Sequence, residues 1–202
     1  MIILGSYAVG KTSLVDRLVY NEFKENETTI GASFNCIMHS GETYQYNLHI
    51  WDTAGQERYR SISQIYYKNT DICMMVYNMN NIESLIDIDN YWIDNFHKNN
   101  YATEDSNISL FIVGNMADIY NAQHNLSTDR HMRDILEKIQ IKYPHIKFFE
   151  ISAKSGYGME RLYECIFEDI DAKIASFLKP PEPEEDYFAD PITTLKTRSQ
   201  CC

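Results

Sequence analysis

The segment GSYAVGKTS, which begins at the fifth residue, is the feature that most constrains the fold of this chain. Gly5 and Gly10 bracket four residues and are followed directly by a lysine and a threonine. This is the spacing of the loop G-x-x-x-x-G-K-[ST], whose backbone amides surround phosphate groups. Such a loop needs a strand before it and a helix after it. Residues 1–4 are strand-like and apolar residues recur at helical spacing in 14–19, so the sequence predicts a phosphate-binding loop.

Composition narrows the class of protein further. The 202 residues are 44% hydrophobic and 13% aromatic, which is typical of one globular domain with an ordinary core. Acidic residues outnumber basic ones by 29 to 18, and the net charge of −11 argues against non-specific binding to nucleic acid. No apolar run approaches the roughly 20 residues that span a bilayer, and no secretory leader is expected before Gly5. The scattered Cys36, Cys73 and Cys165 are typical of a reducing cytosol.

Strand-like apolar runs alternate with helical patterns along most of the chain, an order typical of a parallel sheet covered on both faces. After residues 1–4, these strand-like runs are 43–51, 71–78, 108–115 and 146–152. The Gly41-Glu42 pair predicts a hairpin, so the strand at 43–51 is expected to run antiparallel to the strand before it. We therefore predict an α/β fold with a six-stranded, mostly parallel sheet, one antiparallel strand and helices on both faces.

The composition changes at residue 179. Residues 179–202 hold four of the five prolines, five acidic and three basic residues, and no apolar periodicity. We therefore expect a nucleotide-binding domain at 1–178 and a flexible tail at 179–202.

Three further segments directly follow predicted strands: WDTAGQE at 51–57, GNMAD at 114–118 and ISAKS at 151–155. Ligands of open α/β sheets bind at the carboxyl ends of the strands, so these segments are expected to lie near the phosphate loop. The four segments in this order resemble the small GTPases of the Ras superfamily, and the resemblance extends over residues 1–178. It implies a P-loop NTPase fold that binds GTP and GDP with Mg²⁺.

The resemblance implies how the base is selected. Asp118 accepts hydrogen bonds from the N1–H and the exocyclic amine of guanine, whereas adenine offers no matching pair of donors and leaves the carboxylate unpaired. The other implied base-site residues are Phe23 beside the ring, Asn115 tying two loops together, the Ala153 amide on the guanine oxygen, and Ser152 and Lys154 shaping the pocket.

The same resemblance implies the phosphate and metal site. Lys11 reaches the β- and γ-phosphates, Gly55 offers its N–H to the γ-phosphate, and Gln56 orients the attacking water. The implied catalytic residues are Gln56, Lys11 and Thr29. The implied magnesium site consists of Thr12, Thr29 and, through water, Asp52. The remaining residues of the implied nucleotide-binding loop are Gly5, Ala8, Val9, Gly10 and Ser13.

These roles imply a switch with slow hydrolysis. Thr29 contacts the γ-phosphate only when GTP is bound, so hydrolysis releases its segment. The chemistry depends on positioning and charge stabilisation, and an arginine from an activating protein accelerates it. The resemblance therefore implies an exchange factor and a GTPase-activating protein as partners.

Within the superfamily, the segments IGASF and WDTAGQERYRSISQIYY and the terminal Cys201–Cys202 pair resemble the Rab family, whose members regulate vesicle traffic. Phe34, Trp51 and Tyr66 match the aromatic trio through which Rabs meet effectors. The segments TIGASF and GQERYRS favour the early-endosomal branch of the family.

The tail is expected to attach to membranes by lipid. It has no polybasic patch, so stable attachment needs two prenyl chains, and a Cys-Cys ending resembles the doubly prenylated Rab ending at Cys201 and Cys202. The resemblance implies a GDP-dissociation inhibitor, a prenylation escort and state-selective effectors as partners. It also implies a location on the cytoplasmic face of intracellular, endosomal membranes, with cycling through the cytosol.

Four features depart from the family pattern. Met116 replaces the lysine of N-K-x-D, which predicts weaker nucleotide binding and faster release. Tyr7 stands where Rabs carry a small residue, and its ring either crowds the catalytic glutamine and an incoming arginine or points to solvent. Five residues separate Phe23 from Thr29, one fewer than expected, so Thr28 is an alternative to Thr29. The four residues before the loop are few for a central strand, so either that strand is short or the chain starts earlier.

Three functions from different classes remain open on the sequence. The leading one is a Rab-like GTPase switch. The second is a GTP-binding adaptor with negligible hydrolysis, which Tyr7 and Met116 favour. The third is a P-loop kinase or ATPase, against which Asp118 and the SAK segment argue because they match a guanine site.

Overall fold

A computed structural model describes residues 1–41, 44–59, 64–100, 108–120 and 126–178. Its six-stranded sheet has the order β2-β3-β1-β4-β5-β6. Only the β2–β3 pairing is antiparallel, and the other pairings are parallel. The strands are β1 (Ile2–Leu4), β2 (Ala32–Ser40), β3 (Gln45–Thr53), β4 (Ile72–Asn78), β5 (Ser109–Asn115) and β6 (Lys147–Glu150). The predicted fold class is therefore confirmed.

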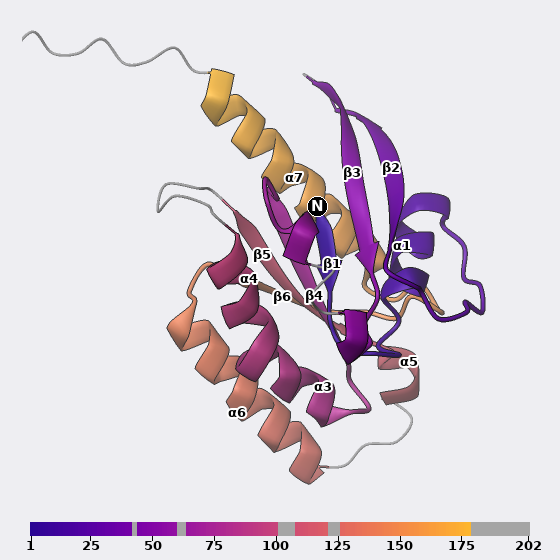
Figure 1. The fold of residues 1–202 in the computed structure, drawn as a ribbon, viewed down its shortest axis with the longest axis vertical. Helices are drawn as coiled ribbons and strands as arrows, with labels where there is room; N and C mark the ends of the chain where they lie inside the picture. Colours follow the sequence, from indigo (N-terminus) through magenta and orange to yellow (C-terminus); the bar gives the residue numbers. More distant parts are fainter. Residues whose placement is uncertain (42–43, 60–63, 101–107, 121–125, 179–202) are drawn as a thin grey trace, which may run out of the picture.

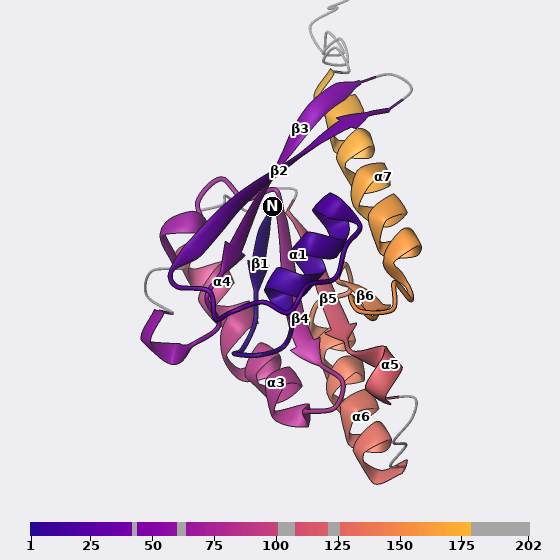
Figure 2. The same cartoon turned by 90° about the vertical axis from the view of Figure 1, so that its right-hand side faces the viewer.

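Helices cover both faces of the sheet (Figure 1 and Figure 2). One face carries α1 (Lys11–Tyr20) and α7 (Met159–Leu178). The other carries α3 (Ile82–Asp87), the π-helical turn Ile88–Trp92, α4 (Ile93–Asn99) and α6 (Leu126–Lys142). Three short elements remain, namely α5 (Ala117–Tyr120) and the 3₁₀ turns Glu57–Tyr59 and Gln64–Tyr66.

The alternation of strand side chains explains these two layers. Ile3 of β1 packs in the cluster under α1 and α7, whereas Ile2 and Leu4 pack in the cluster under α3, α4 and α6. Successive strand residues point to opposite faces, so a central strand flanked by helices on both sides must be apolar throughout. This requirement is why β1 and β4 are continuous apolar runs in the sequence.

The β2–β3 hairpin has one buried face and one open face. Leu48 and Ile50 of β3 are buried, as their alternation predicted. Trp51 lies on the opposite face, where the antiparallel register places it directly across from Phe34 of β2. Glu42, which the sequence predicted to be part of the turn, lies outside the described residues.

The carboxyl ends of β1, β3, β5 and β6 lead into the four segments singled out in the sequence. The last predicted strand, at 146–152, ends earlier in the structure, at Glu150. Ile151 still donates its N–H to the Gly114 carbonyl at 2.7 Å, but the Ser152 N–H turns to the Tyr157 carbonyl at 2.9 Å. The chain therefore leaves the sheet at Ser152, which frees this side chain for the site described below. Among the described helices, none has the length and apolar character needed to cross a membrane.

Candidate functional site

The phosphate loop between β1 and α1 is closed around a buried lysine. Lys11 is the first residue of α1 and only 6% exposed, and its Nζ donates to the carbonyl oxygens of Gly5 and Ser6, both at 2.9 Å. Burial lowers the pKa of Lys11 to about 8, while the charge of Asp52 opposes this shift. A buried ammonium whose bonded partners are neutral carbonyls leaves a positive potential at the start of a helix, where an anion is stabilised.

Glycine is required at two positions, Gly10 and Gly55, where the backbone lies very close to side chains of the site. Gly10 has a φ of 86°, and a Cβ there would lie 2.4 Å from Asn115 Nδ2. A Cβ at Gly55 would lie 2.4 Å from Lys11 Nζ. Both contacts are far shorter than van der Waals distance, so any side chain at these positions would push the loops apart.

Three oxygen-bearing side chains meet beside the loop. Thr12 Oγ1 donates to Asp52 Oδ2 at 2.7 Å and lies 2.8 Å from Thr29 Oγ1. Asp52 is fully buried, and its Oδ1 has no hydrogen-bond partner among the residues that the structure describes. Burial raises the pKa of Asp52, against the opposing effects of the Thr12 hydroxyl and the Lys11 charge.

This donor set fits magnesium. Mg²⁺ prefers oxygen ligands and binds nucleotide sites through one or two protein groups, with water and phosphate completing its shell. A buried carboxylate with an unsatisfied oxygen next to two hydroxyls offers such groups. Thr29 rather than Thr28 faces this cluster, and Thr28 Oγ1 instead lies 3.3 Å from the Tyr7 hydroxyl.

A cavity of about 230 Å³ opens in front of the loop. The loop and the segment before β2 both line it, and so do Gly55 and Met116. The lining residues from the predicted site are Ala8, Gly10, Lys11, Thr12, Ser13, Thr29 and Gly55. The tertiary structure therefore brings together phosphate-site residues that lie as far apart in the sequence as Ala8 and Gly55.

A hydrogen-bonded network joins this cavity to the predicted base site. Asn115 Nδ2 donates to the carbonyl oxygen of Val9 at 3.1 Å, and Asn115 Oδ1 accepts from the Ala153 N–H at 3.1 Å. Ser152 Oγ donates to Asp118 Oδ1 at 2.7 Å and thereby orients that carboxylate. Lys154 and Phe23 are exposed.

The structure also identifies an arginine that sequence reasoning missed. Arg17 of α1 donates from Nε to the Ala153 carbonyl at 2.8 Å and from Nη2 to the Lys154 carbonyl at 2.9 Å. Arg17 therefore holds the base-site loop against α1 through two hydrogen bonds. Its position on a predicted helix carried no motif, so no local signal pointed to it.

A second missed contact supports the phosphate loop. Ser6 Oγ donates to Asp87 Oδ2 at 2.5 Å and lies 3.5 Å from Nε1 of the fully buried Trp92. Both partners belong to the helical layer around the π-helical turn Ile88–Trp92. Turns of this kind occur often at functional sites, and this one places Trp92 under the loop.

The sequence assigned roles to three further residues, of which Tyr7 and Met116 line this cavity. Tyr7 lines the cavity and is 55% exposed, and the crowding of Gln56 by its ring stays a prediction. Gln56 Oε1 accepts from Arg58 Nε at 2.7 Å. Met116 has a positive φ of 66° and also lines the cavity.

The predicted aromatic trio is contiguous in space. The rings of Phe34 and Trp51 lie 5.1 Å apart between centroids, and Trp51 stacks on Tyr66 at 4.5 Å. Phe34 and Trp51 lie opposite each other on the hairpin, and Tyr66 reaches Trp51 from the 3₁₀ turn Gln64–Tyr66. The predicted lipid sites, Cys201 and Cys202, lie outside the described residues.

Comparison with known proteins places this geometry in a family. The sequence profile of the Ras family matches residues 1–172. The Ras-related protein RABG3f of Arabidopsis thaliana is 32% identical over 206 residues, which cover 100% of this chain and 94% of that protein. The Ras-related protein Rab7 of Pisum sativum is 33% identical, covering 95% and 88% of the two chains. The Ypt/Rab-type GTPase Rab7 of Neurospora crassa is 34% identical, covering 95% and 89%.

These similarities correct one prediction. The early-endosomal branch that the sequence motifs favoured is wrong, because relatives matching nearly the whole chain are Rab7 and RABG3 proteins. The motifs used for that prediction lie around the nucleotide and the first switch segment. Different branches of the family bind the same nucleotide and therefore have similar residues around it. These motifs thus indicate which ligand is bound more clearly than they indicate the branch.

Proposed function

This chain belongs to the Ras family of small GTPases and to its Rab group, and we propose that it is a magnesium-dependent GDP/GTP switch in vesicle traffic at endosomal membranes. Members of the family hydrolyse GTP. The observation that carries the proposal is the position of Asn115, whose amide joins the phosphate loop at Val9 to the base loop at Ala153. One side chain thereby fixes the distance between the two ends of a nucleotide site.

The chain's own residues account for binding. Lys11 Nζ exchanges the carbonyl oxygens of Gly5 and Ser6 for phosphate oxygens, which are stronger acceptors because they are charged. Asp118, oriented by Ser152, accepts the two guanine donors. Magnesium, when bound, neutralises phosphate charge beside Thr12, Thr29 and Asp52.

The switch follows from the position of Thr29. Its hydroxyl lies next to Thr12, at the inner end of the cavity, while the rest of its segment forms the outer wall. A γ-phosphate holds this segment through Thr29, and hydrolysis removes that contact. Hydrolysis is slow because Gln56 must leave Arg58 before it can orient a water, and because no arginine finger is supplied without an activating protein.

A change of base preference tests the guanine site. Asp118→Asn replaces an acceptor pair by a carbonyl and an amide donor, and xanthine offers an oxygen where guanine carries its amine. We expect the variant to lose GDP affinity by at least about a hundredfold, since an unpaired polar contact at such a site costs about 3 kcal/mol, and to gain xanthosine diphosphate affinity.

Isothermal titration of GDP, xanthosine diphosphate and ADP in magnesium buffer measures these affinities. Asp134→Asn, on α6, is the matched control and should retain the wild-type order. Equal affinity of the wild type for GDP and ADP would contradict the proposal, as would absence of GDP binding.

A second candidate is a GTP-binding adaptor with negligible hydrolysis. The contact of Tyr7 with Thr28 across the cavity mouth and the engagement of Gln56 by Arg58 favour it. Single-turnover hydrolysis of wild type, Tyr7→Ser and Gln56→Leu separates the two functions. A wild-type rate equal to that of Gln56→Leu, with a faster Tyr7→Ser, indicates an adaptor that Tyr7 has silenced.

We also propose the partners and the membrane anchor. Residues 1–178 act as the switch domain, and residues 179–202 connect it to two prenyl chains on Cys201 and Cys202. The partners are an exchange factor, an activating protein, a GDP-dissociation inhibitor, a prenylation escort and state-selective effectors. Partitioning of wild type and a Cys201→Ser/Cys202→Ser variant between membrane and cytosol fractions tests the anchor, and equal partitioning would contradict it.

A further inference from the structure

A second cavity, of about 410 Å³, opens at the amino-terminal ends of the parallel strands, opposite the phosphate loop. We call it the basal groove. It lies between β3, the segment that leads into β4, and the last turns of α7. Its main apolar lining residues are Leu48, Trp51, Tyr66, Ile72, Ile170 and Phe177. No residue of the predicted nucleotide site lines it.

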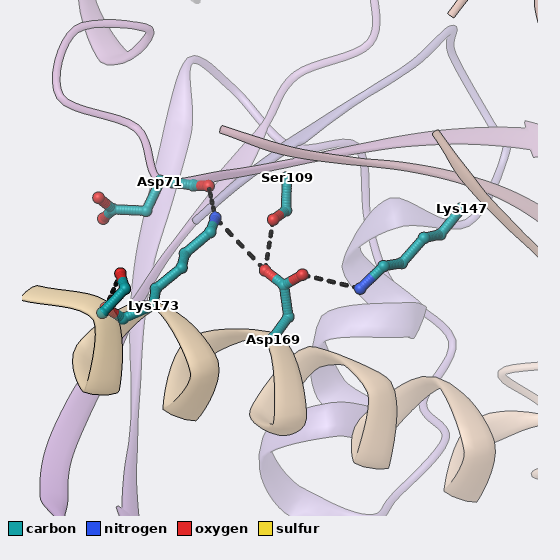
Figure 3. Close-up of polar contacts among 6 residues, drawn as sticks. Asp71, Ser109, Lys147, Asp169 and Lys173 are labelled. Carbon is teal, nitrogen blue, oxygen red and sulfur yellow. Dashed lines mark hydrogen bonds and ion pairs between the residues drawn. The ribbon is translucent and has the colours of Figure 1, made fainter. Parts of the chain in front are cut away.

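A polar network holds α7 in place and so keeps the groove formed (Figure 3). Lys173 Nζ donates to the Asp71 carbonyl oxygen at 2.8 Å and pairs with Asp169 at 3.3 Å. Asp169 also accepts from Lys147 at 2.7 Å and from Ser109. Three elements, β5, β6 and α7, therefore meet at the Asp169 carboxylate, and Lys173 also ties α7 to the segment before β4, so the α7 wall of the groove is held in place.

The groove ends in exposed apolar side chains. Phe177 lines the groove and is 81% exposed, and the next residue, Leu178, is 62% exposed. On the opposite wall Trp51 and Tyr66 stack on each other. Large apolar side chains gathered at an open cavity indicate a surface that another group covers.

We propose that residues Tyr187 and Phe188 of the same chain occupy the basal groove. They are the only aromatic residues in 179–202. Eight residues separate them from Leu178 and can extend over about 26–29 Å, while α7 itself ends at the rim of the groove. The connecting segment is therefore long enough to turn back.

Charge complementarity favours this occupant over an unrelated apolar peptide. Glu184, Glu185 and Asp186 immediately precede the aromatic pair. The charged residues that line the groove are Lys68, Asp71 and Lys173, and Lys173 is already paired with Asp169. Seating the aromatic pair brings three acidic side chains toward the wall that carries Lys68, within the distance over which charges act at physiological salt.

The contact has a consequence for partner binding, which rests on the proposed function. Trp51 and Tyr66 belong both to the groove and to the aromatic trio. The seated tail covers part of the surface expected to meet effectors. The tail thus competes with effectors and lowers their affinity until they displace it.

Tryptophan quenching by acrylamide tests the proposal on the full-length, GDP-loaded chain. The chain has two tryptophans, and because Trp92 is fully buried, Trp51 dominates the quenching. A short tether gives the aromatic pair an effective concentration in the millimolar range, so a contact with a millimolar dissociation constant is occupied about half of the time. If the seated tail shields Trp51, removing the contact exposes Trp51 all of the time and raises the quenching constant about twofold. We expect this rise for the double variant Tyr187→Ser/Phe188→Ser.

A matched control removes two apolar residues from the same tail. Ile192→Ser/Leu195→Ser should leave the quenching constant unchanged. Phe177→Ser, an exposed substitution in the groove itself, should raise it as the aromatic double variant does. No rise in the aromatic double variant, or an equal rise in the Ile192/Leu195 control, would overturn the assignment.

Two further measurements identify the occupant. Raising the salt from about 0.1 M to 1 M shortens the Debye length from about 10 to 3 Å and should raise quenching in the wild type only. Quenching should not change across a dilution series, and a dependence on protein concentration would assign the groove to a second copy of the chain and overturn the proposal. The quenching measurement does not require nucleotide exchange. Failure of the GTPase proposal would therefore appear in the GDP and ADP titrations and not in the quenching data.

Discussion

Within the described part of the chain, a buried lysine lies near each end of the sheet, and the partners of the two lysines differ. Lys11 donates to two neutral carbonyl oxygens, and its nearest charged influence is the neighbouring Asp52. Lys173 donates to one carbonyl oxygen and also pairs directly with Asp169. Burial lowers the pKa of both ammonium groups. A buried cation that lacks a bonded carboxylate is prepared for an anionic ligand, whereas a paired one holds the fold together.

The largest expected effect comes from removing the lysine at the nucleotide end. Lys11→Met should weaken GDP binding by a factor of about 10²–10³, because charge-assisted contacts to a buried anion are worth about 3–4 kcal/mol. The free energy of unfolding of the nucleotide-free protein should not decrease, since no bonded carboxylate is left behind. Titration calorimetry measures the GDP affinity and urea unfolding measures the stability. A Lys11→Met variant that unfolds more easily while binding GDP normally would show that Lys11 stabilises the fold and does not bind the ligand.

The opposite pattern is expected at the basal end. Lys173→Met should lower the free energy of unfolding by about 2 kcal/mol, because Asp169 loses a buried partner but keeps Lys147 and Ser109. GDP affinity should stay at the wild-type value. Adding Asp169→Asn to the first substitution should recover part of the loss, and a double variant less stable than the sum of the single ones would contradict the pairing.

The pH dependence of GDP binding sharpens the contrast. In the nucleotide-free protein, Lys11 loses its proton around its pKa of about 8, and bound phosphate favours the charged form. Affinity should therefore be constant below that pH and fall above it, approaching tenfold per pH unit.

Stability should move in the other direction over the same range. The unfolded chain binds its proton up to the ordinary lysine pKa of 10.5, so the nucleotide-free protein gains stability as pH rises from about 8 toward that value. Lys11→Met is the control for both measurements. Persistence of the affinity loss in that variant would show that another group, such as the guanine N1–H, is titrating.

The smallest effect concerns Met116. Met116→Lys should slow GDP dissociation about five- to tenfold, because an added hydrogen bond to the phosphate loop is worth about 1–1.4 kcal/mol. Met116→Leu, which keeps an apolar side chain on the cavity wall, should leave the rate unchanged. The dissociation rate is measured by the release of a fluorescent GDP analogue. Identical rates for Met116→Lys and the wild type would contradict the prediction that Met116 speeds nucleotide release.

Prediction from the sequence succeeded where the residues concerned are close together in the chain. The loop at residues 5–13 was recognisable because its glycines, lysine and threonine have one allowed spacing. Arg17 lies only one turn further along α1 and was missed, because its partners, the carbonyls of Ala153 and Lys154, are more than 130 residues away. The same reason explains why the contact between Ser6 and Asp87 was not anticipated.

The sequence by itself determined the order of strands and helices and the phosphate loop, because each follows from local spacing. The guanine-site residues came from the resemblance to the Ras superfamily, and their roles stay a prediction. Only the tertiary structure decided that Arg17 holds the base loop, that Thr29 rather than Thr28 faces Thr12, and that a groove forms between β3 and α7. Such contacts depend on how distant elements pack, and packing is set by the summed shape and charge of many residues rather than by any short pattern.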